Sequence, residues 1–383
     1  MLNNPIVRAL ITVFKWFPVV FISAVVIWSY YAFVVQLCVL EIKSECEKAM
    51  YLIFYHFFFV MFAWSYYQCL FTNAARIPDR FHLPPEQVAQ IDSALSIRNY
   101  DSAKTLLESF GRNLPVYTRG FNGGTVFFHI RYCEKCKAIK PDRAHHCSVC
   151  ERCIVKMDHH WINNCVCFNN YKFFILFLAY AMLYCLYISL TDLQYFIKFW
   201  KDQLTEGSAK FHILFLFFIS TMFMISLCTL FSYHIYLTLT NRTTIESYRP
   251  PVFSGGPDKN GWSLGGWANF TEIFGDRKLL WFLPIFSGKG DGSGYPSNSA
   301  RNTLPVTADP QTDIEALSSP SLKSNGHGHS FPIRVAEEDR DDLLRRSQWS
   351  EEGAGDENPV VNFSYASSSL RIENERRPHN SLF

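Results

Sequence analysis

The chain has 383 residues, a formal net charge of +2 and 49% hydrophobic residues. So small a net charge, without a basic patch between aromatic residues, argues against nucleic acid as a partner. The apolar residues are gathered into a few long stretches, which is not typical of a soluble globular protein.

Four stretches predict membrane-spanning helices, because each holds about 18 or more residues without a fixed charge. They are residues 17–40, 51–71, 173–190 and 211–239. At 1.5 Å per residue, such a helix crosses a hydrocarbon layer of about 30 Å. The first stretch is too long, and too poor in small residues at its end, for a cleaved signal peptide. We therefore expect an α-helical polytopic membrane protein, with spans one and two in residues 17–71 and spans three and four in residues 173–240.

Basic residues predict the orientation of these spans. Lys and Arg are concentrated between the second and third stretches and again after the fourth. The positive-inside rule then places both termini and the central segment in the cytosol. Residues 191–210 would form an outer loop, although three lysines in it argue mildly the other way. The expected location is an endomembrane, such as the Golgi or endoplasmic reticulum, or the plasma membrane.

The polar parts of the chain differ in composition. Residues 1–16 form a short cytosolic N-terminus, and residues 72–130 a helical spacer, in which apolar residues at helical spacing after Pro84-Pro85 predict one or two amphipathic helices. Residues 241–287 are punctuated by Gly and Pro but rich in aromatics, so they are expected to pack on the protein or the membrane surface. Residues 288–383 are rich in Gly, Ser, Asn and Glu and predict a disordered tail. Within it, residues 339–344 resemble an acidic dileucine sorting signal, a short pattern that often arises by chance.

Residues 131–172 contain a cysteine cluster. Seven of the twelve cysteines lie between Cys133 and Cys167. Cytosolic thiols stay reduced, so repeated C-x-x-C pairs with intervening histidines predict zinc ions and not disulfides. The segment supplies eight ligands: two such pairs, Cys153, one later cysteine and two histidines. Eight ligands make two closed tetrahedral sites, which is typical of structural zinc that a segment poor in apolar residues needs to fold.

The pair Asp158 and His159 predicts chemistry beside the metal sites. An aspartate directly before a histidine can orient the ring and stabilise its protonated form. A histidine held in this way can take the proton of a neighbouring thiol and create a thiolate nucleophile.

At this point the residues resemble a known family, the DHHC-type zinc-containing protein S-acyltransferases, or palmitoyltransferases. The similarity lies in RYCEKC, IKPDRAHHCSVC, the Asp-His-His triplet, WINNCV and NNYKFF, and in Thr-Thr-Ile-Glu at residues 243–246 and the segment around Asn269. The resemblance implies transfer of a long-chain acyl group from acyl-CoA to an enzyme cysteine. The group would then pass to a cysteine of a membrane-proximal substrate protein. His159 would be the base and Asp158 its orienting residue.

The same resemblance implies a set of binding residues. The first zinc would take Cys133, Cys136, His146 and Cys153, and the second would take Cys147, Cys150, His160 and a cysteine after Asn164. Ser29 and Tyr184 would line the closed end of an acyl-chain cavity or serve in helix packing, and Trp161, Phe174 and Phe177 would line its mouth. Four basic residues would meet CoA phosphates or form a solvated face beside anionic lipid: Lys135, Lys137, Lys140 and Arg143. His56 and His234 are polar residues within spans, which suggests a functional role, but helix packing or a headgroup contact is favoured.

The chain departs from the family at the nucleophile. The family motif is Asp-His-His-Cys-Pro-Trp, whereas here His160 is followed directly by Trp161. The family spacing from this histidine to the last zinc ligand fits Cys167, but the flanking asparagines and Val166 align with Cys165, which we favour. The remaining thiol lies too far along the chain to replace the nucleophile. We expect little or no transfer. The alternatives are a non-catalytic membrane adaptor, a splice variant or gene-model error of an active enzyme, and, more distantly, a zinc-ribbon or ubiquitin-ligase module.

Overall fold

The computed structural model describes residues 5–119, 130–204, 209–253 and 256–295. All of them belong to one compact unit, Met1–Gly328. Most of the predicted tail, including the possible sorting signal at residues 339–344, lies outside the described residues.

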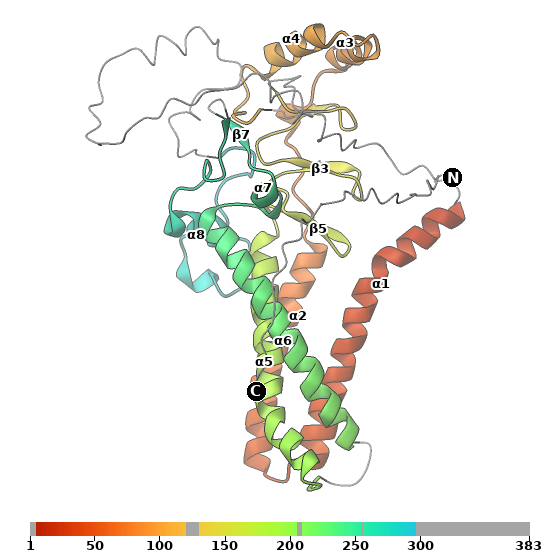
Figure 1. The fold of residues 1–383 in the computed structure, drawn as a ribbon, viewed down its shortest axis with the longest axis vertical. Coiled ribbons are helices and arrows are strands. Elements are labelled where there is room, and N and C mark those ends of the chain that lie inside the picture. The colour runs from red at the N-terminus through yellow and green to blue at the C-terminus, as the bar shows by residue number, and fades with distance from the viewer. Residues whose placement is uncertain (1–4, 120–129, 205–208, 254–255, 296–383) are drawn as a thin grey trace, which may run out of the picture. The chain divides into compact units, whose positions relative to one another are not determined.

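Four long helices form the bundle shown in Figure 1. They are α1 (Pro5–Tyr30), which continues as the π-helix η1 (Tyr31–Glu41), α2 (Glu45–Phe71), α5 (Tyr171–Trp200) and α6 (Ala209–Thr240). Each contains a stretch that is long and apolar enough to cross a membrane. The predicted polytopic α-helical fold class is therefore confirmed.

The third span is longer than predicted. The sequence places it at residues 173–190 with a loop at 191–210, whereas α5 continues to Trp200. The first charged residue of the predicted loop, Asp192, does not end the helix because its side chain is fully buried within the bundle. A charge-free stretch thus gives a minimum length for a span, and packing decides where the helix ends.

Helix α5 is the central element of the bundle, where it packs along α2 and α6. In its most apolar stretch 61% of the residues are buried, against 17% in each of the other three spans. The apolar side chains that α1, α2 and α6 leave exposed face the surface of the bundle, where lipid replaces water. The bundle therefore has the outward apolar surface of a membrane protein.

The predicted amphipathic region forms two helices, α3 (Pro85–Ser96) and α4 (Tyr100–Gly111). Helix α4 begins at Asn99, whose side chain accepts a hydrogen bond from the Ser102 amide. Ile91 and Leu107 are fully buried between these helices and the cysteine-rich region. The two helices thus pack the spacer onto the cysteine cluster. A short helical turn, η2 (Asp79–Phe81), precedes them in the chain.

Three antiparallel hairpins build the cysteine-rich region between α2 and α5. They pair β1 (Tyr132–Cys133) with β2 (Ala138–Ile139), β3 (His145–Cys147) with β4 (Arg152–Ile154), and β5 (His159–Trp161) with β6 (Asn164–Val166). Isolated hairpins this short are not stable in water. The three short hairpins therefore need further contacts with one another, which the side chains of the cysteines and histidines supply.

The first two hairpins each place a C-x-x-C pair at the turn. Cys133 ends β1, Cys136 lies in the turn, and the second pair occupies the same positions between β3 and β4. The residue after each pair has a left-handed backbone: φ is 54° at Lys137 and 52° at Glu151. This conformation turns the chain sharply and brings both cysteines of a pair to one side.

After α6 the chain returns to the cysteine-rich region. It forms α7 (Thr244–Tyr248), the short hairpin of β7 (Val252–Phe253) and β8 (Gly256–Pro257), α8 (Gly266–Phe274) and η3 (Lys278–Leu280). The sequence assigns everything after residue 287 to the tail, whereas residues 288–295 pack on the protein. Gly292 lies so close to Phe168 that a Cβ at Gly292 would be 2.7 Å from its ring. The absence of side chains at glycine thus favours close packing here, although composition predicts disorder.

Candidate functional site

The eight predicted zinc ligands lie in two groups of three sulfurs and one imidazole nitrogen. The first group is Cys133, Cys136, His146 and Cys153, and the second is Cys147, Cys150, His160 and Cys165. In each group the ligand atoms lie within 4.8 Å of one another. The first group joins the β1–β2 hairpin to β3 and β4, and the second joins the turn after β3 to the β5–β6 hairpin.

The distances in both groups fit a tetrahedral zinc ion. With Zn–S bonds of about 2.3 Å and Zn–N bonds of about 2.0–2.1 Å, ligand atoms in a tetrahedron are about 3.5–3.8 Å apart. His146 Nδ1 lies 3.3, 3.6 and 3.8 Å from its three sulfurs. His160 Nδ1 lies 3.5, 3.5 and 3.6 Å from its own. Protein atoms fill all four positions of each group, as in structural zinc sites.

Strand register explains why Cys165 and not Cys167 lies in the second group. His160 and Cys165 are directly opposite in the β5–β6 pair, so their side chains leave the hairpin on the same face. Strand β6 ends at Val166, and the Cys167 amide donates to the Asn170 side chain at the next turn. Cys167 Sγ instead accepts a hydrogen bond from the Ala75 amide and is fully buried.

The Asp158 and His159 side chains form a hydrogen-bonded pair beside the second group. His159 Nδ1 lies 2.6 Å from Asp158 Oδ2. Because a carboxylate only accepts, Nδ1 carries the proton, and the lone pair of Nε2 is left to act as a base. Thr244, at the start of α7, donates to the same carboxylate from its amide (2.8 Å) and its hydroxyl (2.7 Å).

These hydrogen bonds control the charge of Asp158. Burial alone would raise the pKa of this carboxyl, since only 1% of it is exposed. Hydrogen bonds from His159 and Thr244 outweigh burial and hold the pKa of Asp158 below its usual value. Asp158 is thus a buried carboxylate whose partners keep it ionised.

His234, in α6, packs against α5 beside this pair. Its ring centroid is 5.9 Å from that of His159 and 4.9 Å from that of Phe174, and its Nδ1 is 3.2 Å from the Tyr171 hydroxyl. The sequence singles out His234 as a polar residue within a span but does not predict this place. His56 packs between α1 and α2: its ring nitrogens lie within hydrogen-bond distance of the Tyr30 hydroxyl and the Leu52 carbonyl.

The three aromatic residues predicted at the mouth of an acyl-chain cavity lie together next to His159. The ring of Trp161 is 5.5 Å from that of Phe174 and 5.0 Å from that of Phe177, and His159 is 5.2 Å from Phe174. They are carried by β5 and the first two turns of α5. This apolar surface therefore begins at the base and continues along α5 into the bundle.

Ser29 and Tyr184 meet deeper in the bundle, in a chain of hydroxyl groups that joins three spans. Ser29 Oγ donates to the Val26 carbonyl (2.9 Å), so it accepts from the Tyr184 hydroxyl at 3.1 Å. Tyr184 has then used its proton and accepts from the Tyr55 hydroxyl at 2.6 Å. Tyr55 was not predicted from the sequence, since a tyrosine in an aromatic span gives no sign of which hydroxyl it will meet.

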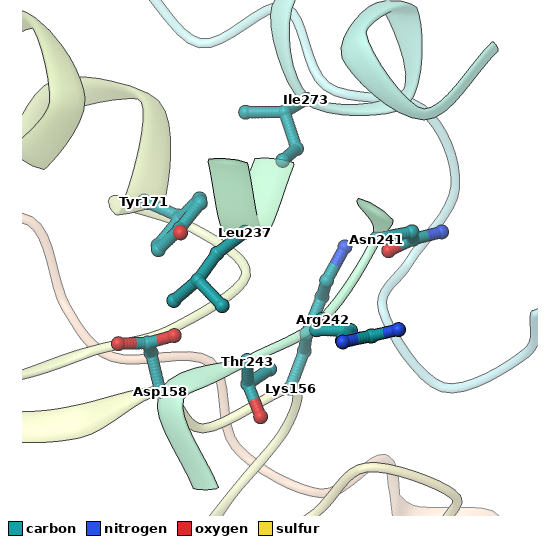
Figure 2. Close-up of a pocket in the computed structure, with 8 residues that line it drawn as sticks. All are labelled: Lys156, Asp158, Tyr171, Leu237, Asn241, Arg242, Thr243 and Ile273. Carbon is teal, nitrogen blue, oxygen red and sulfur yellow. The ribbon is translucent and has the colours of Figure 1, made fainter. Parts of the chain in front are cut away.

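Two cavities accompany these residues. A small one of about 10 Å³ lies beside Asp158, and Lys156 and Asn241 are among its other lining residues (Figure 2). That volume holds about one water molecule, so it is no substrate site. An apolar one of about 460 Å³ lies between α1 and α6. Its lining residues are Phe21, Ala24, Val25, Trp28, Ile219, Met222 and Phe223.

The charge pattern predicts that Arg143 is solvated or binds phosphate. This prediction is wrong. Its guanidinium is buried and donates twice to Glu246 (2.9 and 2.8 Å) and twice to Asn241 (2.8 and 3.1 Å). Among the other three basic residues of that set, Lys137 pairs with Asp92 at 2.7 Å, while Lys135 is exposed and Lys140 half-buried. Arg143 thus ties the cysteine-rich region to the Thr-Thr-Ile-Glu segment after α6.

Asn164 attaches the cysteine-rich region to the second span. Its side-chain amide lies 2.8 Å from the Thr72 carbonyl and 3.2 Å from those of Cys69 and Leu70. These carbonyls belong to the last turn of α2 and the residue after it, where no helical amide remains to bind them. The hairpin that carries His159 is therefore fixed to the end of a membrane span.

Comparisons with known proteins agree with this geometry. A model of the family described as DHHC palmitoyltransferase matches residues 126–250. The chain is 48% identical to palmitoyltransferase ZDHHC2 of Danio rerio over 341 residues, which cover 88% of this chain and 90% of that protein. It is 48% identical to palmitoyltransferase ZDHHC20 of Homo sapiens over 345 residues, which cover 88% and 91%. Palmitoyltransferase ZDHHC15 of Xenopus laevis is also 48% identical, over 297 residues that cover 76% and 86%. With four candidate membrane spans and two groups of three cysteines and a histidine between spans two and three, the chain belongs to the DHHC palmitoyltransferase family.

Proposed function

We propose that this chain keeps the zinc sites, the base and the acyl-binding surface of a palmitoyltransferase but lacks the thiol that carries the acyl group. The observation that carries the proposal is the direct link from His160 to Trp161, where the family motif has Cys-Pro between them. Long-chain acyl-CoA and proteins with cysteines near the membrane would be its partners, as in the family. The cysteine-rich region and both termini would lie in the cytosol, at the Golgi, endoplasmic reticulum or plasma membrane.

The two zinc ions would be held by the two cysteine and histidine groups and would supply folding energy, not chemistry. The two ligand groups would then link the three hairpins to one another. The Asp158–His159 pair is carried by the last of these hairpins, so zinc would set the position of the base relative to the bilayer.

The thiols near His159 are already engaged. Among the residues that the structure describes, the only hydrogen bond of the His159 ring is with Asp158. Cys165 Sγ lies 3.5 Å from His160 Nδ1, and Cys167 Sγ accepts from the Ala75 amide. Neither thiol is therefore available to His159 as a nucleophile.

The tip of the β5–β6 hairpin is short and has a β-branched residue in a left-handed conformation. Only Ile162 and Asn163 join β5 to β6, and Ile162 has a φ of 53°. A β-branched residue is disfavoured in this left-handed conformation by about 1–2 kcal/mol. Cys-Pro between His160 and Trp161 would add chain at this hairpin, next to the base.

The chemistry that the missing thiol would perform is acyl transfer. His159 Nε2 would take the thiol proton, and the thiolate would attack the thioester carbonyl of acyl-CoA. The CoA thiolate would leave with the proton from His159, and the acyl group would remain on the enzyme as a thioester until a substrate cysteine took it. Without the thiol, Asp158 and His159 have no group to activate, so binding remains and turnover is lost.

The test separates binding from transfer. Three full-length chains are placed in nanodiscs: the natural one, one with Cys-Pro inserted between His160 and Trp161, and one with Ser-Pro inserted there. All three are expected to bind a non-hydrolysable thioether analogue of palmitoyl-CoA. Only the Cys-Pro chain is expected to take a hydroxylamine-sensitive label from alkyne palmitoyl-CoA, because Ser-Pro restores the length of the hairpin without its thiol.

Two results would contradict the proposal. Label on the natural chain that persists in Cys165→Ser and Cys167→Ser variants would show another nucleophile. Failure of the natural chain to bind the analogue would leave only the adaptor function, without an acyl site. In the Cys-Pro chain, Asp158→Asn should lower the labelling rate by about 10²–10⁴-fold with binding unchanged, because without the carboxylate the His159 proton is no longer held on Nδ1 and Nε2 no longer acts as the base.

A further inference from the structure

Residues 279–286, with the sequence LLWFLPIF, form an uncharged loop after α8. Much of this loop is exposed: 88% of Leu279, 68% of Phe282, 41% of Ile285 and 45% of Phe286. Large apolar side chains gathered in this way mark a surface that is covered by a partner. The chemistry of that partner follows from where the loop lies on α5.

The loop runs along the first turns of the third span. The Tyr180 hydroxyl donates to the Phe282 carbonyl at 2.6 Å. Tyr180 is nine residues past the start of α5, which is about 13 Å along the helix. Helical side chains lean back by up to about one turn, so the contact lies at least about 8 Å along α5 from its first residue. In Figure 1 the loop (cyan) lies below α8, at the height of the first turns of α5.

Side chains of α5 satisfy the carbonyls of the loop. Lys172 Nζ donates to the Leu280 carbonyl (2.7 Å) and to the Ile285 carbonyl (2.8 Å), and Tyr180 serves the Phe282 carbonyl between them. Within the loop, the Leu283 amide donates to Leu280 and the Ile285 amide to Leu283. Pro284 has no amide hydrogen to satisfy. Non-helical backbone is tolerated at membrane depth only when its polar groups are bound in this way.

Basic residues stand at both ends of the loop. Arg277 and Lys278 precede it and Lys289 follows it, all three exposed. Lys289 pairs with Asp276, which leaves a net positive charge at this rim. Long basic side chains with an apolar segment between them match the headgroup layer of a bilayer, where their charges face phosphate while the segment enters the acyl chains.

We propose that the 279–286 loop is inserted in the bilayer leaflet beside the cysteine-rich region, with lipid acyl chains around Phe282 as its partner. The depth of the Phe282 carbonyl agrees with the 5–10 Å to which interfacial segments enter the acyl boundary. The sequence predicts that residues 241–287 are cytosolic and pack on the protein or the membrane surface, whereas this proposal places part of that segment within the leaflet. The loop anchors α8 and the first turn of α5, next to His159, at a fixed depth.

The experiment identifies what covers Phe282. The photoreactive residue p-benzoyl-L-phenylalanine replaces Phe282 in the full-length chain, in nanodiscs of phosphatidylcholine and phosphatidylserine. After irradiation, intact mass spectrometry counts lipid adducts. The matched control places the same residue at Ile97, which is 73% exposed but lies between α3 and α4. Lipid adducts at position 282 are expected to exceed those at position 97 at least fivefold.

Equal yields at the two positions would overturn the proposal. Crosslinked dimers at position 282 without lipid adducts would also overturn it, since they would show a second copy of the chain as the partner. A second variant tests the anchoring contacts. Tyr180→Phe with Lys172→Met should lower the lipid-adduct yield at position 282 at least twofold while zinc content stays unchanged. An unchanged yield would show that α5 does not hold the loop at depth.

Discussion

Replacing Arg143 by Met tests the buried contact between the cysteine-rich region and the segment after α6. The change removes four hydrogen bonds, two to Glu246 and two to Asn241. It also removes the cation that neutralises the Glu246 carboxylate, of which only 5% is exposed. Removing one partner of a buried ion pair typically costs about 3–5 kcal/mol, because the other charge is left buried. We expect a loss of this size.

Zinc release during urea unfolding measures this effect. With an m-value of about 1–3 kcal/mol per molar urea, the expected loss lowers the midpoint by at least about 1 M. Lys137→Met is the matched control, because Lys137 has a similar left-handed backbone, with a φ of 54° against 63° at Arg143. Its pair with Asp92 is exposed, with 43% and 40% of the two side chains in solvent, and such pairs contribute about 0–1 kcal/mol.

A double variant separates the buried charge from the lost packing. Glu246→Gln removes the unpaired charge but keeps an oxygen that can accept from the Thr243 amide at the start of α7. Arg143→Met combined with Glu246→Gln should therefore recover much of the loss. Equal midpoint shifts for Arg143→Met and Lys137→Met, or no recovery in the double variant, would refute the account of this contact.

Three further predictions concern the metal sites, the hydroxyl chain and the base. Cys165→Ser should lower zinc from two ions to one per chain by elemental analysis, whereas Cys167→Ser should keep both; equal stoichiometry in the two variants would contradict the assignment of ligands. Tyr184→Phe removes two interhelical hydrogen bonds, whereas Tyr55→Phe removes one, and each contributes about 0.6 kcal/mol. Tyr184→Phe should therefore lower the melting temperature in detergent about twice as much as Tyr55→Phe does. A larger decrease for Tyr55→Phe would argue against the hydroxyl chain. In the chain with Cys-Pro inserted, Thr244→Val should slow acylation about tenfold in single-turnover measurements without loss of zinc, because it removes one hydrogen bond to the Asp158 carboxylate; an unchanged rate would show that Thr244 does not position the base.

Local features of the sequence predict the spans and the ligand types, because both depend on residues close together in the chain. A charge-free stretch of sufficient length forms a membrane helix wherever it occurs, and C-x-x-C pairs turn sharply at any hairpin. The choice of Cys165 over Cys167 needs more, since it depends on the register that sets His160 opposite Cys165. Spacing alone favours Cys167, and alignment of the flanking residues favours Cys165.

Contacts between distant segments could not be predicted. Arg143 has the charge of a phosphate-binding residue, and only the fold shows that Glu246, 103 residues later, neutralises it. Asp192 has the charge of a loop residue, yet it is buried in α5. The place of His234 beside His159 likewise depends on how α6 packs on α5. In each case the residue type limits which interactions are possible, and the packing of distant segments determines which of them forms.

The central claim is that the base is present and its thiol is absent. Intact mass spectrometry after incubation with palmitoyl-CoA tests it most directly, because it counts acyl groups on the whole chain. The natural chain is expected to show no hydroxylamine-labile acyl group, and the chain with Cys-Pro between His160 and Trp161 is expected to gain one. A labile acyl group on the natural chain, whether at Cys165, at Cys167 or at another residue, would contradict the claim.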